Sequence, residues 1–100
     1  MGSLSATWKP TYKKGFEPLI PDVDFVKFGD AESLTDSISE YTAAVIVEPI
    51  QGEGGVNLPP SDYLQEVRKI TEEVGAAMIL DEIQTGLGRT GSFWNCNQTN

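Results

Sequence analysis

Two stretches decide the fold of this 100-residue chain: AAVIVEPIQGEGG at residues 43–55 and AAMILDEIQTGLGRTG at residues 76–91. Each begins with about five apolar residues that do not alternate with polar ones, as is typical of a strand covered on both faces of a parallel sheet. Acids follow each run, namely Glu48 after the first and Asp81 and Glu82 after the second. We therefore predict strands at 43–47 and 76–80.

An amphipathic helix is predicted between the two strands. The apolar residues Leu64, Val67, Ile70 and Val74 recur at spacings of three and four, which is the helical period. Ser61 is a suitable N-cap, with Asp62 in the first turn, and Gly75 stands where a left-handed C-terminal cap belongs. The order strand, loop, helix, strand predicts a right-handed βαβ unit with parallel strands over residues 43–100.

Residues 1–42 carry weaker signals. Pro18 and Pro21 make residues 15–24 an extended connector. Residues 25–28 (FVKF) read as a short strand ended by glycine. Asp30 is a plausible N-cap for a helix that carries the following apolar residues at helical spacing: Leu34, Ile38 and Tyr41. The expected fold class is α/β.

The ends of the two predicted strands form the candidate site. In parallel α/β sheets, ligands bind beyond the carboxyl ends of the strands. Glu48 and Asp81 occupy these ends. If the strands are neighbours, both carboxylates and the glycine-rich loop at 51–55 face one crevice.

Composition excludes several classes of function. There are 7 Lys and Arg against 15 Asp and Glu, for a net charge of -8, so nucleic acid and anionic membrane surfaces are not expected partners. The absence of His excludes His-Cys zinc sites, the Ser-His-Asp triad and the Cys-His dyad. One cysteine, Cys96, excludes an internal disulfide.

The sequence also bears on the compartment. No apolar run approaches the roughly 20 residues of a membrane helix, and no signal peptide is visible at the amino terminus. The single cysteine favours a reducing compartment, and we expect a cytoplasmic protein. We also expect the match of residues 97–99 (NQT) to the glycosylation pattern to be fortuitous.

Two other readings of the second stretch remain open. An apolar strand followed by Asp81 and Glu82 fits a Walker B segment, but the phosphate loop of such an NTPase needs a Gly-Lys pair, which this chain lacks. Residues 86–91 (GLGRTG) match the pattern GxGxxG. A dinucleotide fingerprint, however, must directly follow a strand and open a helix, and residues 81–85 intervene.

Taken together, EPIQGEGG at 48–55 and ILDEIQTGLGRTG at 79–91 closely resemble the class III aminotransferases, which depend on pyridoxal 5'-phosphate (PLP) and have the fold-type I architecture. LSAT at 4–7 and FEPL at 16–19 resemble the same family. The resemblance implies a segment of the PLP-binding large domain, in a homodimer whose active site lies at the subunit interface. It also implies transfer of an amino group from an ω-amine or a basic amino acid to a 2-oxo acid.

The resemblance assigns roles to four residues. Asp81 matches the carboxylate beside the pyridine nitrogen of PLP, where ion pairing favours the protonated ring. Gln84 matches the residue that contacts the phenolic oxygen of the ring. Glu48 is assigned support of the cofactor pocket. Glu53 matches the residue that pairs with an arginine near the carboxyl end of the family's chains and gates substrate binding. Arg89 is expected to anchor its own loop rather than bind a substrate carboxylate.

The family's Schiff-base lysine lies downstream of GLGRTG, and no lysine follows Lys69 here. We therefore expect the 100 residues alone to be inactive. A standalone acidic α/β binding or interaction module derived from such an enzyme is the alternative. Because the predicted helices cannot cover both faces of a sheet, we also expect partly uncovered apolar strand residues and marginal stability or self-association. These residues are Val45, Ile46, Met78 and Ile79.

Overall fold

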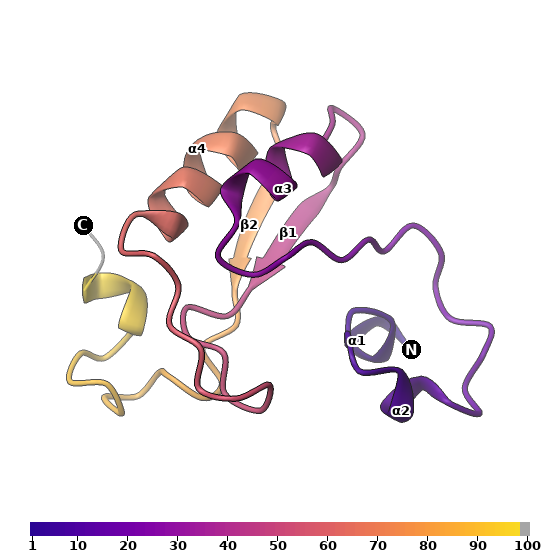
Figure 1. Cartoon of the computed structure of the whole chain (residues 1–100), viewed down its shortest axis with the longest axis horizontal. Coiled ribbons are helices and arrows are strands. Elements are labelled where there is room, and N and C mark those ends of the chain that lie inside the picture. The colour runs from indigo at the N-terminus through magenta and orange to yellow at the C-terminus, as the bar shows by residue number, and fades with distance from the viewer. Residues whose placement is uncertain (99–100) are drawn as a thin grey trace.

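The computed structural model describes residues 1–98 and shows a two-stranded parallel sheet with two helices packed on one face (Figure 1). The strands are β1 (Ala44–Val47) and β2 (Ala77–Leu80). The helices on the sheet are α3 (Ala31–Ser37) and α4 (Tyr63–Val74). Two short helices, α1 (Gly2–Ser5) and α2 (Pro10–Lys13), precede them, and a 3-10 turn, η1 (Asn95–Gln98), follows.

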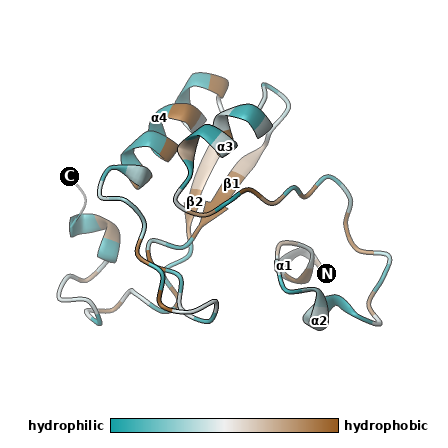
Figure 2. Ribbon diagram, in the orientation of Figure 1, coloured by the Kyte–Doolittle hydropathy of each residue, from teal (hydrophilic) through white to brown (hydrophobic). Residues whose placement is uncertain are grey.

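The βαβ unit is confirmed. β1 and β2 pair in parallel with Ala44 opposite Ala77 and Val47 opposite Leu80, and α4 connects them. Figure 2 shows mostly hydrophilic residues along the outward face of α4 and apolar residues in the strands behind it.

The core lies between the helices and one face of the sheet. Its buried members come from both helices and from β1: Leu34, Val47, Tyr63, Leu64 and Val67. Val45, Met78 and Leu80 pack against this cluster from the sheet. Ile46 and Ile79 point to the other face and remain 56% and 47% exposed. The expectation of partly uncovered apolar strand residues is thus confirmed, most strongly for these two isoleucines.

The C-terminal cap of α4 is as predicted, whereas its start is not. Gly75 is left-handed, with φ of 77°, and the amide of Ala76 donates to the carbonyl of Thr71 at 2.9 Å. At the other end, Asp62 rather than Ser61 is the N-cap. The amide of Tyr63 donates to the carbonyl of Pro60 at 3.1 Å, in a turn that precedes the helix. The Pro60 carbonyl is thus the acceptor for this amide, in place of the Ser61 hydroxyl that the sequence predicts.

The α3 helix begins as predicted but ends early. The side chain of Asp30 accepts a hydrogen bond from the Ser33 amide at 3.1 Å, which confirms the N-cap. The helix stops at Ser37, with Ile38 as an extended C-cap, so the expectation that Tyr41 lies on this helix is wrong. The amide of Ser39 instead bonds the hydroxyl of Thr42 at 3.1 Å, which stabilises a turn.

The predicted strand at 25–28 is wrong as well. These residues form no β-ladder. In the described part of the chain, the sheet consists of β1 and β2 alone. The segment contributes side chains instead of backbone hydrogen bonds. Val26 and Phe28 pack against the core, and the ring of Phe28 meets that of Tyr63 edge-on, with centroids 5.5 Å apart.

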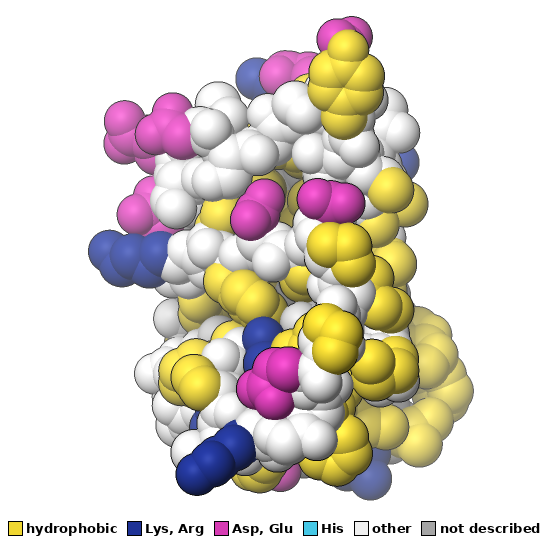
Figure 3. Space-filling view, turned by 90° about the vertical axis from the view of Figure 1, so that its right-hand side faces the viewer, with side chains coloured by type: hydrophobic (Ala, Val, Ile, Leu, Met, Phe, Trp, Pro, Cys, Tyr) yellow, Lys and Arg dark blue, Asp and Glu magenta, His cyan; other side chains and the backbone are white. Residues whose placement is uncertain are grey.

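The N-terminal helices α1 and α2, which were not predicted from the sequence, lie apart from the sheet and its helices (Figure 1). Figure 3 faces this side and shows many apolar side chains, with charged side chains among them, over its lower half. The exposed apolar residues of this segment include Trp8, Tyr12, Phe16 and Phe25. The segment contacts the glycine loop, where Lys9 Nζ donates to the carbonyl of Glu53 at 3.3 Å.

Candidate cofactor-binding edge of the sheet

The carboxyl ends of both strands lie side by side and carry the predicted acids. The register Val47 opposite Leu80, extended by one residue, brings Glu48 beside Asp81. The amide of Asp81 still donates to the carbonyl of Val47 at 2.9 Å, so the ladder reaches this point. Because side chains alternate along a strand, Asp81 continues the open face of Ile79.

Glu48 fastens the glycine loop that follows β1. Its side chain is half-buried, and Oε2 accepts a hydrogen bond from the amide of Gly52 at 3.2 Å. Further along, Gln51 and Asn57 form an isolated antiparallel bridge through both of their backbone hydrogen bonds. The loop therefore folds back on itself beyond the end of β1.

Gln84 meets this loop from the other strand. A Cβ placed on Gly52 would stand only 3.1 Å from Cγ of Gln84, so the absence of a side chain at Gly52 lets the two loops approach. The contact brings the carboxamide of Gln84, the loop held by Glu48 and the end of β2 to one edge of the sheet.

Asp81 is exposed at this edge, and its Oδ1 accepts a hydrogen bond from the amide of Ile83 at 3.1 Å. This bond turns the chain sharply after β2 and leaves Gln84 one turn further on. A carboxylate beside the pyridine nitrogen favours the protonated ring, and a side-chain amide can donate to the ring oxygen. Asp81 and Gln84 supply this pair of groups, and the close approach at Gly52 provides a backbone surface without a side chain, so the residues present fit PLP.

Glu53 and Arg89 occupy more peripheral positions. Glu53 is exposed in the glycine loop, where its carbonyl accepts the bond from Lys9; its gating role stays a prediction. Arg89 donates from Nη1 to the carbonyl of Gly86 at 3.1 Å, which confirms that it anchors its own loop.

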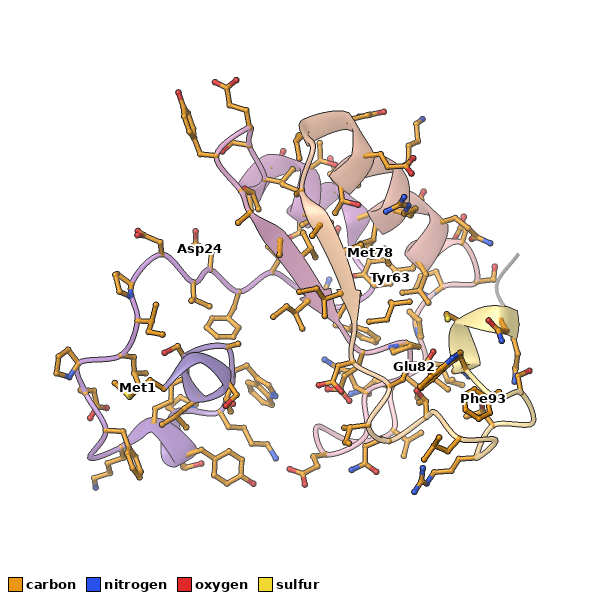
Figure 4. All side chains as sticks on the ribbon, turned by 180° about the vertical axis from the view of Figure 1, so that it is seen from behind. Met1, Asp24, Tyr63, Met78, Glu82 and Phe93 are labelled. Carbon is orange, nitrogen blue, oxygen red and sulfur yellow. The ribbon has the colours of Figure 1, made fainter. Side chains whose placement is uncertain are left out.

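Glu82 has a role that was not predicted from the sequence. Figure 4 shows this side chain between the end of β2 and the η1 turn. Its Oε2 accepts from the amide of Asn95 at 2.7 Å and from the hydroxyl of Thr85 at 2.9 Å, and Oε1 accepts from the amide of Cys96 at 2.9 Å. In the local sequence, only the three-residue spacing of Glu82 and Thr85 could indicate this role. The two amide donors come from residues 13 and 14 positions away.

The electrostatics of this cluster follow from these bonds. Burial by itself raises the pKa of Glu82, but the hydrogen bonds from the amides of Cys96 and Asn95 and from Thr85 outweigh it, so the pKa is lowered from 4.5. Burial raises the pKa of the Cys96 thiol from 9.0, and the neighbouring carboxylate of Glu82 raises it further. The carboxylate is thus held in its charged form and the thiol in its neutral form.

A shallow cavity lies on the helix side of the end of β2, lined by Leu80, Glu82, Trp94 and Cys96. Asp81 does not line it, so the candidate site is an open edge and not this cavity. Within residues 1–98, no group of three or more Cys, Asp or Glu side chains is arranged to hold a metal ion. No helix in the same range has the length and apolarity to cross a bilayer. Thr99 of the glycosylation pattern lies outside the described residues.

Comparison with known proteins assigns the chain to a family. The model of the family described as aminotransferase class-III matches residues 1–100. The acetylornithine aminotransferase of Methanopyrus kandleri is 51% identical over 94 residues, which make up 94% of this chain and 24% of the relative.

Two solved structures have the same fold over nearly the whole chain. The ornithine aminotransferase of Toxoplasma gondii, with partial occupancy of PLP at its active site, has a TM-score of 0.91 at 34% identity over 97% of this chain and 23% of its own. The (S)-enantioselective ω-transaminase of Thermomicrobium roseum has a TM-score of 0.88 at 36% identity over 99% of this chain and 27% of its own. The chain thus spans about a quarter of the length of these relatives, and it belongs to the class III aminotransferases.

Proposed function

We propose that the whole protein carrying this chain is a PLP-dependent aminotransferase that moves an amino group from an ω-amine or a basic amino acid to a 2-oxo acid. Family membership supports the reaction, and the names of its relatives, an acetylornithine aminotransferase, an ornithine aminotransferase and an ω-transaminase, support the class of amino donor. The observation that carries the proposal is the edge where Glu48 and Asp81 end parallel strands in register and Gln84 packs over Gly52.

Each residue has a part in holding the cofactor. When bound, PLP withdraws electrons from the amino-bearing carbon of the substrate. The Asp81 carboxylate holds a proton at the pyridine nitrogen by charge pairing, and the Gln84 carboxamide donates to the phenolic oxygen and orients the ring. Glu48 keeps the Gly52 amide in place, which preserves the close approach of the two loops.

Other parts of the proposal concern groups beyond this edge. We propose that Glu53 gates the binding of the two substrates through an arginine of the whole protein. We also propose a cytoplasmic homodimer with its active site at the subunit interface. Light scattering of the purified whole protein tests the dimer, and a monomer at all concentrations would contradict it.

The 100 residues by themselves are proposed not to transaminate. No lysine lies between residues 70 and 100, so the lysine that links PLP in this family is not among them. Borohydride reduction after addition of PLP, followed by mass measurement, tests this: a single stable adduct that depends on Asp81 would contradict it.

The central experiment uses the whole protein with PLP, a panel of ω-amines and basic amino acids as donors, and a 2-oxo acid as acceptor. Asp81→Asn keeps the size of the side chain and removes its charge. We expect kcat to fall by about 100-fold, the order found when one electrostatic contact to a reacting system is removed. Glu73→Gln, on the exposed face of α4, is the matched control. Full activity in Asp81→Asn would contradict the assignment.

A further inference from the structure

Glu82 stands between the two proposed ring contacts, Asp81 and Gln84, yet it faces the other way. By strand alternation its side chain continues the helix side of β2, where Leu80 packs against the core. Its carboxylate gathers three donors, from Thr85, Asn95 and Cys96, at 2.7 to 2.9 Å. Charge-assisted bonds of this length are among the stronger hydrogen bonds in proteins.

The backbone of the same residue is also fixed. The amide of Gly86 donates to the carbonyl of Glu82 at 2.8 Å, so the turn that contains Gln84 is closed at its base. A Cβ on Gly86 would stand 2.9 Å from this carbonyl and 2.9 Å from the Trp94 ring. Residues 82–86 are therefore fitted tightly against residues 94–96.

These hydrogen bonds contribute more to stability because two of their donors are buried. Thr85 is 5% exposed and Asn95 is 8% exposed, so little water can replace a lost acceptor. A donor left without a partner in such a place costs more than an exposed one. These bonds thus couple residues 85–96 to the turn at 81–84.

We propose that Glu82 is a positioning residue for the cofactor ring: by tying Thr85, Asn95 and Cys96 to the base of the turn, it fixes the directions in which Asp81 and Gln84 face PLP. This inference rests on the proposed function. It adds a residue that touches neither ring nor substrate and acts through its two neighbours.

The test uses the whole protein without PLP and the probe pyridoxine 5'-phosphate, which carries the same ring but cannot bond covalently to a lysine. Glu82→Gln keeps the shape of the side chain but turns an NH2 group toward one of its donors. Thr85→Val removes one of the three donors at nearly constant volume and serves if Glu82→Gln does not fold. Asp81→Asn tests the proposed function itself, and Glu73→Gln is the control.

Two quantities are measured. Calorimetry gives the Kd of the probe, and we expect it to rise by about tenfold in Glu82→Gln and by about threefold in Thr85→Val, in line with the free energy of one or two hydrogen bonds. The 15N chemical shift of the ring nitrogen at saturating probe reports whether that nitrogen carries a proton. We expect it to move toward the unprotonated value in Glu82→Gln and to stay unchanged in Glu73→Gln.

The outcomes separate the two proposals. If Asp81→Asn changes neither the Kd nor the 15N shift, the proposed role of the ring contact is wrong. If Asp81→Asn changes both while Glu82→Gln and Thr85→Val leave the 15N shift at the unmutated value, the positioning role is overturned and Glu82 serves stability alone. A shift in the Glu82 and Thr85 variants that follows the shift in Asp81→Asn supports it.

Discussion

The loops that follow β1 and β2 begin alike and are held very differently. Each starts with an acid at the end of an apolar strand and continues into a glycine-rich stretch. The Glu48 carboxylate receives a hydrogen bond from the Gly52 amide, in a loop that is largely exposed. The Glu82 carboxylate accepts bonds from Thr85, Asn95 and Cys96, and two of these three residues are buried. Similar sequence patterns therefore give one loop that is largely exposed and one whose acid is held by buried donors, at the same edge.

The largest expected effect comes from the glycines of the two loops. Gly86→Ala would place a methyl group 2.9 Å from the Glu82 carbonyl and from the Trp94 ring, and we expect a loss of about 3 kcal/mol, at the upper end for overpacking in a core. Gly52→Ala would meet only the flexible Gln84 side chain at 3.1 Å, with a loss below about 1 kcal/mol. Denaturant unfolding of the whole protein measures both. Equal losses would show that the second loop is no more tightly fitted than the first.

The two acids give the next contrast. Glu82→Gln disturbs a cluster of charge-assisted bonds, and we expect the segment 85–96 to lose about 2 kcal/mol of stability against local opening. Glu48→Gln keeps an oxygen for the Gly52 amide, so its effect should be below about 0.5 kcal/mol. Peptide-resolved hydrogen exchange measures both. Unchanged protection of 85–96 in Glu82→Gln would contradict the view of a fixed loop.

The pH dependence tests the same acid without changing its shape. Since the pKa of Glu82 is lowered in the folded state from 4.5, its contribution to stability is complete above that value. It is lost as the pH falls through the lower folded pKa. We expect the stability difference between the unmutated protein and Glu82→Gln to be larger at about pH 7 than at about pH 3. A difference that does not depend on pH would mean that the charge of Glu82 is not what holds the loop.

The smallest effect concerns backbone strain. Both loops contain left-handed residues. The first has Gly55 at φ of 97°, and the second has Gly88, Gly91 and one residue that is not glycine, Leu87 at φ of 60°. Leucine is disfavoured there, and asparagine tolerates this region better. Because Leu87 is 66% exposed, we expect Leu87→Asn to raise the free energy of unfolding by about 0.5 kcal/mol. The melting temperature should rise slightly as a result. A lower melting temperature would indicate that the leucine side chain has a packing partner in the whole protein.

The sequence predicted regular elements where their signals were local. The apolar runs, the helical spacing of Leu64 and Val67, and Gly75 identified the βαβ unit, because period and cap depend on near neighbours. The predicted strand at 25–28 is wrong for the opposite reason, because a strand depends on hydrogen bonds to a partner strand that local sequence does not report. Within the described residues FVKF packs side chains on the core and pairs with no strand. The end of α3 failed because a turn at residues 39–42 competed with the apolar spacing.

In the candidate site, too, the features that depend on near neighbours were predictable and the long-range contacts were not. Strand ends are readable from sequence, so the pattern of apolar runs and acids was enough to place Glu48 and Asp81 at one edge. The role of Glu82 could not be read, because its amide partners, at Asn95 and Cys96, are far away in sequence and a backbone donor leaves no residue-type signal.

The two-residue connection between α4 and β2 has a consequence for how chain length can change. Gly75 and Ala76 alone separate Val74 from Ala77. A one-residue insertion or deletion here would shift β2 by one position and exchange its two faces. Met78 and Leu80 would leave the core, and Asp81 would turn toward the helices. An insertion or deletion among the exposed residues 54–56, between the bridged residues Gln51 and Asn57, would leave the faces of both strands unchanged. Natural or engineered variants of this unit should therefore gain and lose residues there and keep the α4–β2 spacing unchanged.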